Sequence, residues 1–142
     1  MAVRNAEAAW DGSLKEGKGT MRLGSGAWEG PFSFTTRFED EAGTNPEELI
    51  GAALAGCFSM ALSAGLGRGG FTAKRIATKA RVHIEKVEGG FGVTKIELTT
   101  DAEVPGVDEA TFQQAVQATK AGCPISKALS AVPITVEAKL QG

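Results

Sequence analysis

The chain has 142 residues, a length that fits one domain. A domain of this size can bury roughly two-thirds of its unfolded surface, so it needs neither a disulfide nor a metal to hold together. Fifteen Lys and Arg residues against seventeen Asp and Glu residues give a net charge of -2, with no basic block. This balance excludes the dense positive surface that nucleic-acid binding requires, and we expect no nucleic-acid partner.

The N-terminal segment "MAVRNAEAAWDGSLKEGKGT" carries charges throughout and has no apolar run of secretory length. We therefore expect no signal peptide and a cytoplasmic location. The chain has two cysteines, Cys57 and Cys123. In a reducing compartment, cysteines are more often catalytic or redox-sensing than joined in a structural disulfide.

The N-terminal third has the composition of short strands separated by glycines. The segments "AEAAWDG", "KGTMRLGSG" and "PFSFTTRFE" predict a β-meander. In the third segment, phenylalanines and a threonine share one parity, whereas Arg37 lies on the other parity with Ser33 and Thr35. Arg37 is therefore expected on the third strand.

A long helix is predicted after "GTNP". With Asn45 as N-cap and a proline at the first helical position, Glu48 is placed to close a capping box; if Thr44 is the cap, Glu47 takes that role. The helix extends to about Leu66, where "GRGGF" stops it.

This helix contains an uncharged run from Leu49 to Gly67 that approaches the length of a membrane span. The run includes four glycines, two serines and many alanines, so its transfer from water into lipid is only weakly favourable in free energy. We expect instead a helix buried on all sides in a soluble protein, with no membrane association.

A hairpin, two helices and a strand follow in the second half. Clean alternation predicts a strand over Ile76–Glu85, and "VEGGFG" turns the chain into a second strand with a bulge near Lys95. A helix starts after Asp108 as N-cap and ends at Gly122. A short helix then begins with proline, so Cys123 lies at or beside its N-cap, and "PITVEAKL" forms a last strand. No linker divides the chain, and we expect residues 1–142 to form a single domain.

Metal chemistry is not expected from these residues. The two cysteines match no zinc pattern, since neither has a second Cys or a His at the spacing that zinc ligands show. His83 lies on the polar parity of its strand and is expected to be a solvated surface residue.

The two thiols have different reasons to be reactive. Cys123 at a helix N-terminus is exposed to the positive end of the helix dipole and to unpaired N–H groups, which favour the thiolate; the alternative is a small polar cap that contains sulfur. Cys57 lies mid-helix, where burial raises the pKa of a thiol unless a cation compensates. Arg37 is the leading candidate for that cation, and its alternative is an outward-facing strand charge.

Helix geometry distinguishes the two neighbouring acids. Glu48 points to roughly the opposite face of the helix from Cys57, whereas Glu47 is rotated from Cys57 by only about 80° around the helix axis. Glu47 also lies about 15 Å from Cys57 along a straight helix, too far for direct contact. Either a carboxylate from another chain meets the thiol, or the arginine bridges the gap.

These residues carry a family resemblance. The stretch "RFEDEAGTNPEELIGAALAGCFSMAL", followed by "KAGCPISKAL", resembles the osmotically inducible protein C (OsmC) family, which is related to the organic hydroperoxide resistance (Ohr) proteins. The likeness covers essentially the whole chain, including "GFGVTKIELTTDAEVPGVD" and the early tryptophan and "GKGT" segments. Leu54 departs from the pattern, since some relatives carry His or Tyr there, so no polar assistance is expected from position 54.

The resemblance implies an α+β fold assembled as an intertwined homodimer, with antiparallel β-sheets around central long helices and active sites at the subunit interface. It implies a thiol-dependent peroxidase that acts on organic hydroperoxides and, less well, on hydrogen peroxide. By position, Cys57 would be the peroxidatic nucleophile and Cys123 the resolving thiol. Arg37 and Glu47 would be the activating pair, supplied at least partly by the other chain. No cofactor or metal is implied, and the reductant would be a dithiol of the lipoyl type.

Two other functions stay open. The chain could be a non-catalytic dimeric protein that binds a small apolar ligand, with cysteines that are merely buried. It could also be a thiol redox sensor that signals to a partner instead of clearing peroxide. The phenylalanines near Arg37 and the apolar helix face would supply an alkyl-binding pocket in the peroxidase.

Overall fold

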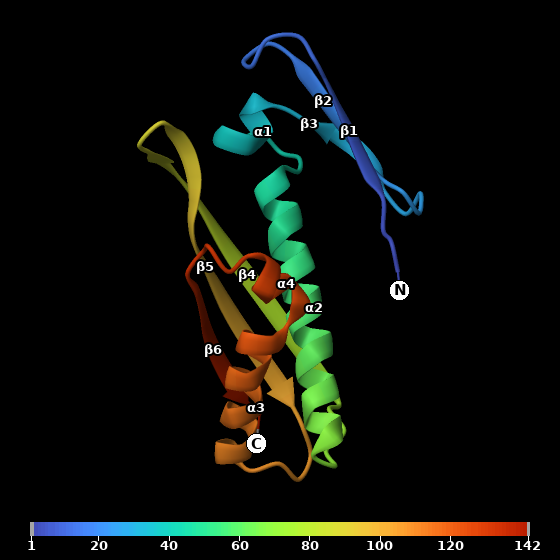
Figure 1. Cartoon of the computed structure of the whole chain (residues 1–142), viewed down its shortest axis with the longest axis vertical. Coiled ribbons are helices and arrows are strands. Elements are labelled where there is room, and N and C mark those ends of the chain that lie inside the picture. Colours follow the sequence, from blue (N-terminus) through green and yellow to red (C-terminus); the bar gives the residue numbers. More distant parts are fainter. Residues whose placement is uncertain (1, 142) are drawn as a thin grey trace. The chain divides into compact units, whose positions relative to one another are not determined.

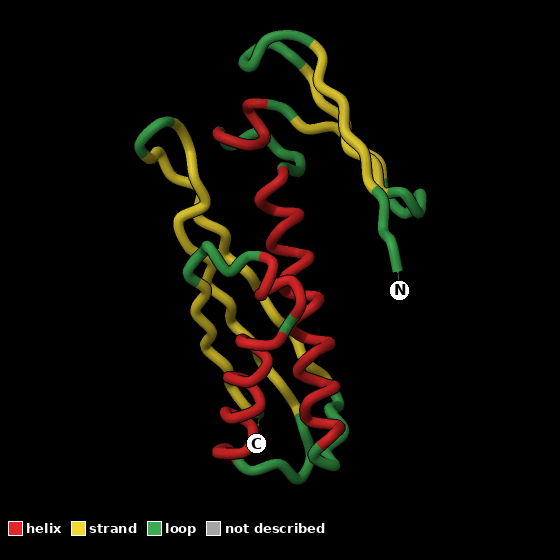
Figure 2. The backbone as a smooth tube through the Cα atoms, in the orientation of Figure 1, coloured by secondary structure: helices red, strands yellow, loops and turns green. Residues whose placement is uncertain are grey.

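Contacts divide the chain into two compact units, and the boundary in the sequence falls between Leu49 and Ile50. The computed structural model describes residues 2–141. Each unit contains its own three-stranded sheet, β1-β2-β3 in the first and β4-β5-β6 in the second. Figure 1 labels these elements along the chain, and Figure 2 shows their strands in yellow.

The first unit contains the predicted meander. Strands β1 (Ala6–Asp11), β2 (Lys18–Leu23) and β3 (Glu29–Phe32) pair antiparallel in chain order, which confirms the prediction for these segments. Gly19 on the middle strand lies opposite Trp10 on one side and Phe32 on the other. The rings of these two neighbours therefore flank a position without a side chain.

The expectation of a strand through Arg37 is wrong. After β3 the chain forms a short helix, α1 (Phe34–Phe38), and Arg37 lies in its last turn. The cause is a capping box: the Ser33 hydroxyl accepts from the Thr36 N–H at 3.2 Å, and the Thr36 hydroxyl accepts from the Ser33 N–H at 2.9 Å. These local hydrogen bonds satisfy the helix N-terminus and outweigh the alternating pattern.

Helix α2 (Pro46–Arg68) begins where the sequence predicts and ends two residues beyond the predicted limit. The side chain of Asn45 caps it by accepting from the Glu48 N–H at 2.8 Å. After Arg68 the helix gives way to two glycines, and Gly70 has a φ of 90°, which few other residues adopt. The N-cap prediction is confirmed.

The prediction that this helix is buried on all sides is wrong for the chain by itself. One face, with residues spaced by four, is fully buried against the second sheet, and it consists of Leu54, Phe58, Leu62 and Leu66. The opposite face carries small residues and Met60, which is 77% exposed. Among residues 2–141 this is the one helix that is, by length and composition, long and apolar enough to cross a membrane.

The second unit has a mixed sheet. Strands β4 (Arg75–Val87) and β5 (Gly90–Glu103) form the predicted antiparallel hairpin. His83 pairs with Lys95 and Ile84 with Val93, so Thr94 is the extra residue of a bulge, next to the position predicted. Strand β6 (Ile134–Leu140) pairs with β5 in parallel, which corrects the expectation of antiparallel sheets. The parallel pairing follows from the helical crossover between β5 and β6.

The crossover consists of α3 (Glu109–Gly122) and the five-residue helix α4 (Pro124–Ala128). Asp108 caps α3 as predicted, since its carboxylate accepts from the Thr111 N–H at 3.3 Å. Figure 1 shows α2 and α3 on one face of the second sheet. The buried core of this unit lies between them and the sheet, and its members beyond α2 are Ile96, Leu98, Ala102, Val104, Phe112, Val116 and Cys123.

Phe112 is fully buried in this core, so we expect the Phe112→Ala variant to lose about 3–5 kcal/mol of unfolding free energy. Gln117 is exposed on the same helix, and Gln117→Ala should change stability by less than about 0.5 kcal/mol. Urea unfolding followed by circular dichroism at one fixed protein concentration measures both. Equal losses in the two variants would contradict the core assignment.

Candidate active site

The structure brings the two cysteines of the chain together in the second unit. The Sγ atoms of Cys57, on α2, and Cys123, between α3 and α4, lie 2.7 Å apart. Both are free thiols, and their two sulfurs share a hydrogen bond. A disulfide bond is about 2.05 Å long, so oxidation could join the two sulfurs with a small local movement.

The position of Cys123 follows from the residues on either side of it. Helix α3 ends at Gly122, and Cys123 has extended backbone angles, with φ of -58° and ψ of 126°. Pro124 then starts α4, and a proline disfavours a helical conformation in the residue before it. The predicted N-cap position is confirmed, but the thiol makes no capping hydrogen bond. The alternative of a polar cap that contains sulfur is therefore not supported.

The two thiols differ in accessibility. Cys57 is half-buried, whereas Cys123 is 1% exposed and belongs to the hydrophobic core. A dissolved peroxide can therefore reach Cys57 more readily than Cys123.

Burial raises the pKa of the Cys57 thiol above its ordinary value, and the hydrogen bond shared with Cys123 raises it further. The backbone N–H of Ile125, in the first turn of α4, acts in the opposite direction and lowers it. The net direction is upward, so the thiolate of Cys57 needs a further positive charge to form near neutral pH. Sequence reasoning missed the Ile125 N–H, because a backbone contact across helices leaves no signal in the sequence.

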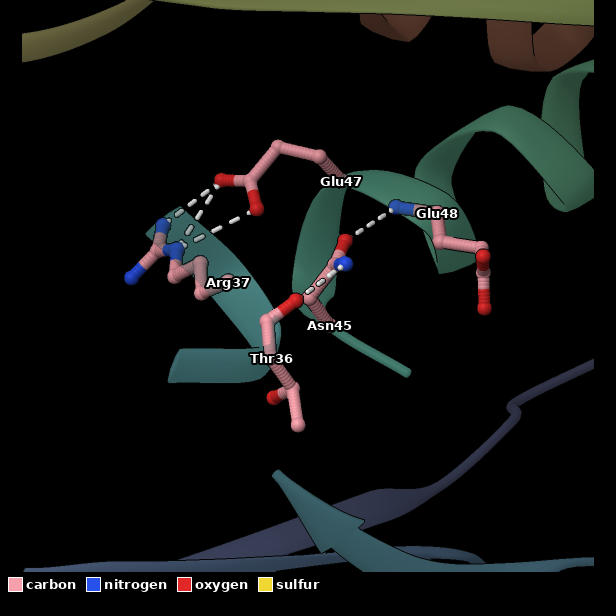
Figure 3. A network of polar contacts seen from close by, with 5 residues as sticks. All are labelled: Thr36, Arg37, Asn45, Glu47 and Glu48. Atoms are coloured by element: carbon pink, nitrogen blue, oxygen red, sulfur yellow. Dashed lines mark hydrogen bonds and ion pairs between the residues drawn. The ribbon is translucent and has the colours of Figure 1, made fainter. Parts of the chain in front are cut away.

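The structure pairs Arg37 with Glu47 in the first unit (Figure 3). The Arg37 Nε atom lies 3.1 Å from both carboxylate oxygens, and Nη2 lies 2.7 Å from Oε1. The Glu47 side chain is 8% exposed, whereas that of Arg37 is 37% exposed. A buried carboxylate thus holds a partly accessible guanidinium in a bidentate contact, which fixes its plane.

The local structure explains why Glu47 and not Glu48 is the partner. The Glu48 N–H is engaged by the Asn45 cap, and the Asn45 side-chain amide donates to the Thr36 carbonyl at 2.9 Å, which ties the start of α2 to α1 (Figure 3). Glu48 itself is exposed. The sequence-based preference for Glu47 therefore agrees with this arrangement.

The four residues selected from the sequence thus form two pairs, one within each unit. Arg37 contacts Glu47 in the first unit, and Cys57 contacts Cys123 in the second. The outward-facing strand charge considered for Arg37 does not describe it, since it lies on a helix and is ion-paired.

His83 is not the solvated residue that its strand parity predicts. Its side chain is half-buried, and Nε2 lies 2.5 Å from Oε1 of Glu97, a carboxylate that is also 3.7 Å from Arg81 Nη1. The hydrogen bond from His83 is the main cause that lowers the pKa of Glu97. Within residues 2–141, no group of three or more His, Cys, Asp or Glu residues is placed to hold a metal ion.

A cavity of about 280 Å³ lies beside Arg37 within the first unit. Sequence reasoning expected phenylalanines here but missed Trp10 and Leu14, which come from the start of the chain. The early tryptophan before "GKGT" was the available signal, although only pairing across β1, β2 and β3 places Trp10 near Phe32 and Arg37.

Comparison with known proteins decides the family. Residues 38–138 match the model of the family described as OsmC-like protein. The chain belongs to the OsmC-like family. It is 51% identical to the Peroxiredoxin OsmC of Escherichia coli strain K12 over 139 aligned residues. This alignment covers 97% of this chain and 96% of that protein. It is 36% identical over 87 residues to an Organic hydroperoxide resistance protein of Xanthomonas axonopodis pv. citri, or 61% of this chain and 59% of that one.

Solved structures agree with this OsmC-like assignment. The organic hydroperoxide resistance protein OhrB of Bacillus subtilis superposes with a TM-score of 0.70 at 26% identity, over 95% of this chain and 98% of that one. An OsmC-like protein of Vibrio cholerae shares the fold with a TM-score of 0.77 at 17% identity, over 98% of this chain and all of that one. The resemblance read from the sequence and the α+β fold class are confirmed.

Replacing Cys123 should lower the pKa of Cys57. In Cys123→Ala the hydrogen bond that raises this pKa is gone, while the Ile125 N–H stays. The rate of Cys57 alkylation by iodoacetamide, followed by peptide mass spectrometry, should therefore reach its midpoint at lower pH in the variant than in the parent protein. In urea the two proteins should have the same midpoint, because unfolding exposes Cys57 to water in both. An unchanged or higher midpoint in the folded variant would contradict this account.

Proposed function

We propose that this chain is a thiol-dependent peroxidase that reduces organic hydroperoxides, and less effectively hydrogen peroxide, to alcohols or water. The observation that carries the proposal is the 2.7 Å separation of the Cys57 and Cys123 sulfurs. Identity of 51% to a protein named Peroxiredoxin OsmC supports the reaction class, and the relatives named for organic hydroperoxide resistance support the substrate class.

Cys57 is the proposed nucleophile, because it is the more accessible thiol of the pair. Its thiolate attacks the distal oxygen of the hydroperoxide, and the O–O bond breaks. The alkoxide leaves and takes up the proton that Cys57 had lost, so an alcohol and a Cys57 sulfenic acid are formed. Arg37 stabilises the thiolate and steers the peroxide, while Glu47 orients the guanidinium through the bidentate pair.

Cys123 is the proposed resolving thiol. Its sulfur attacks the sulfenic sulfur of Cys57, the S–O bond breaks, and water leaves with the Cys123 proton. The resulting Cys57–Cys123 disulfide is reduced by an external dithiol of the lipoyl type through two exchange steps, which restores both thiols. No cofactor is needed, since the dithiol supplies both electrons.

The activating pair is proposed to reach each Cys57 at least partly from a second copy of the chain in a homodimer. The exposed face of α2 supports this assembly: it carries Ala52, Gly56, Ser63 and Gly67, whose small side chains allow another backbone to come close, together with the exposed Met60. We further propose that residues 1–142 form one domain that acts in the cytoplasm. The family match over residues 38–138 runs across the boundary between the two units and supports the single domain.

The cysteine roles are tested by peroxide consumption with several alkyl hydroperoxides and with monothiol and dithiol reductants. Cys57→Ser should abolish consumption. Cys123→Ser should permit one oxidation event, after which mass spectrometry should find Cys57 as sulfinic or sulfonic acid, because no resolving thiol is present. Substantial turnover by Cys57→Ser would defeat the assignment.

The same assay separates the alternative functions. Many turnovers per chain with a dithiol argue against a redox sensor. A Cys57 thiol that does not react with stoichiometric cumene hydroperoxide would favour a non-catalytic binding protein.

Arg37→Lys should lower kcat/KM for organic hydroperoxides roughly 10- to 100-fold, the range expected when hydrogen bonds to a charged group are lost. An ammonium is a point charge and cannot reproduce the planar fork that contacts both Glu47 oxygens. Steady-state kinetics measure the change, and Arg22→Lys, at an exposed ion pair in the same unit, is the matched control. Near-parental rates in Arg37→Lys would show that only the charge matters.

A further inference from the structure

The two sulfurs of the proposed disulfide are not equivalent targets for an external thiol. In thiol–disulfide exchange, the attacked sulfur binds the incoming thiol and the other sulfur leaves as a thiolate. The backbone N–H of Ile125 donates a hydrogen bond to the Cys57 sulfur, which stabilises negative charge on that sulfur as it leaves. Cys57 is therefore favoured as the leaving group, and the external thiol is expected to attack Cys123.

An external thiol needs a defined approach to Cys123, because this residue is only 1% exposed. A cavity of about 340 Å³ within the second unit offers one, and Cys123 is the one of the two cysteines that lines it. Apart from Cys123, Thr119 and Arg68, the lining consists of alanines and glycines from α2 and α3. These small residues leave room between the two helices for an unbranched aliphatic chain.

Arg68 is the charged residue of this cavity. It lies in the last turn of α2, and its side chain folds back along the helix, since a Cβ atom at Gly65 would lie 3.5 Å from Arg68 Nη2. Arg22, Arg37 and Arg81 each form an ion pair with a glutamate. Within residues 2–141, by contrast, no carboxylate lies within ion-pair distance of Arg68. Its guanidinium is therefore available to an anionic ligand.

Arg68 and Cys123 lie toward opposite ends of the cavity. Figure 1 shows α2 and α3 running in opposite chain directions, so the end of α2 lies beside the first half of α3, whereas Cys123 follows the end of α3. Along α2 the lining extends from Ala61 to Arg68, which corresponds to about 10 Å of helix rise. One molecule that contacts both ends must therefore carry its sulfur and its anionic group on a chain of similar length.

We propose that this cavity binds a thiol reductant that carries a carboxylate, with the carboxylate on Arg68 and the attacking sulfur at Cys123. The planar guanidinium suits a carboxylate, because it can donate two parallel hydrogen bonds to the two oxygens. The inference rests on the proposed function, since the Cys57–Cys123 disulfide is its target. Hydroperoxide and reductant then contact different arginines, Arg37 for the first and Arg68 for the second.

The exchange at this site is complete with a dithiol. Its first thiolate attacks the Cys123 sulfur, the Cys57–Cys123 bond breaks, and Cys57 leaves as a thiolate. Its second thiolate then attacks the reductant sulfur of the mixed disulfide, and Cys123 leaves. The two protons of the dithiol end on Cys57 and Cys123, and the dithiol becomes a cyclic disulfide. A dithiol joined to a carboxylate by an aliphatic chain, such as dihydrolipoate, has the required chemistry.

Reduction of the preformed disulfide tests the role of Arg68. The protein is oxidised with diamide and then mixed with dihydrolipoate or with dihydrolipoamide, which carries the same dithiol without the carboxylate charge. Acid quenching, iodoacetamide labelling and mass spectrometry follow the return of the thiols. The parent protein should react about two- to fivefold faster with dihydrolipoate, the range expected for an exposed ion pair. Arg68→Gln should lose this preference and keep the parental rate with dihydrolipoamide.

Arg75→Gln is the matched control, because Arg75 is an exposed cation of the same unit outside the cavity; it should keep the preference. The net charge of the chain is -2, so its overall field does not attract an anionic dithiol. The preference should also fade as salt is added, since salt screens an exposed ion pair. Equal rates with the two dithiols in the parent protein would overturn the proposal.

A pair of substitutions on α3 tests the approach to Cys123. Ala118 lines the cavity and Gln117 does not, although both are exposed on the same helix. Ala118→Leu should slow reduction by both dithiols severalfold, because the larger side chain occupies the cavity, whereas Gln117→Leu should not. Oxidation of Cys57 by one equivalent of cumene hydroperoxide should be unchanged in both variants. Parental reduction rates in Ala118→Leu would contradict this approach.

These outcomes separate failure of the inference from failure of the proposed function. A preference for dihydrolipoate that depends on Arg68, in a protein that does not consume peroxide, would leave the reductant site standing and remove the peroxidase. Peroxide consumption by a protein that reacts equally with both dithiols would remove the reductant site alone.

Discussion

The second unit depends on the contact between the Cys57 and Cys123 sulfurs. These atoms lie 2.7 Å apart, although their residues are separated by 66 positions in the sequence. For this contact to form, α2 must pack its Leu54 and Phe58 face against the sheet, and the crossover must break between α3 and α4 at Cys123. Gly122 and Pro124 make that break, because one ends a helix readily and the other begins one. The hydrophobic core and the cysteine pair are thus built by the same contacts, and Cys123 belongs to both.

The chemistry follows from an electrostatic conflict. Burial brings the sulfurs together but raises the pKa of Cys57, and a neutral thiol is a poor nucleophile. The Ile125 N–H offsets part of this effect within the second unit. The first unit holds a guanidinium against the buried carboxylate of Glu47, with a cavity rich in aromatic rings beside it. The proposed peroxidase unites these features: a cation for the thiolate, a second thiol for the sulfenic acid, and an apolar site for the organic group.

Local signals in the sequence predicted elements well where one signal dominates. Asn45 before proline, Asp108 before α3, and the phase change near Lys95 each depend on neighbours within a few residues, and the structure contains all three features. The strand predicted through Arg37 failed because two local signals compete there, and the Ser33 and Thr36 hydrogen bonds override alternation. The parallel pairing of β6 and the contact of His83 with Glu97 were also missed, because pairing partners distant in sequence decide them.

The sequence by itself determined the family, the two cysteines, the preference for Glu47, and the positions at which α2, α3 and α4 begin, because these depend on residue identity and short-range spacing. Only the tertiary structure decided that the Cys57 and Cys123 sulfurs touch, that Arg37 binds Glu47 in a bidentate contact from a helix, and that Trp10 joins Phe32 over Gly19. Each of these contacts joins separate elements of the fold. Their geometry is set by strand register and by the packing of buried faces, which no local pattern specifies.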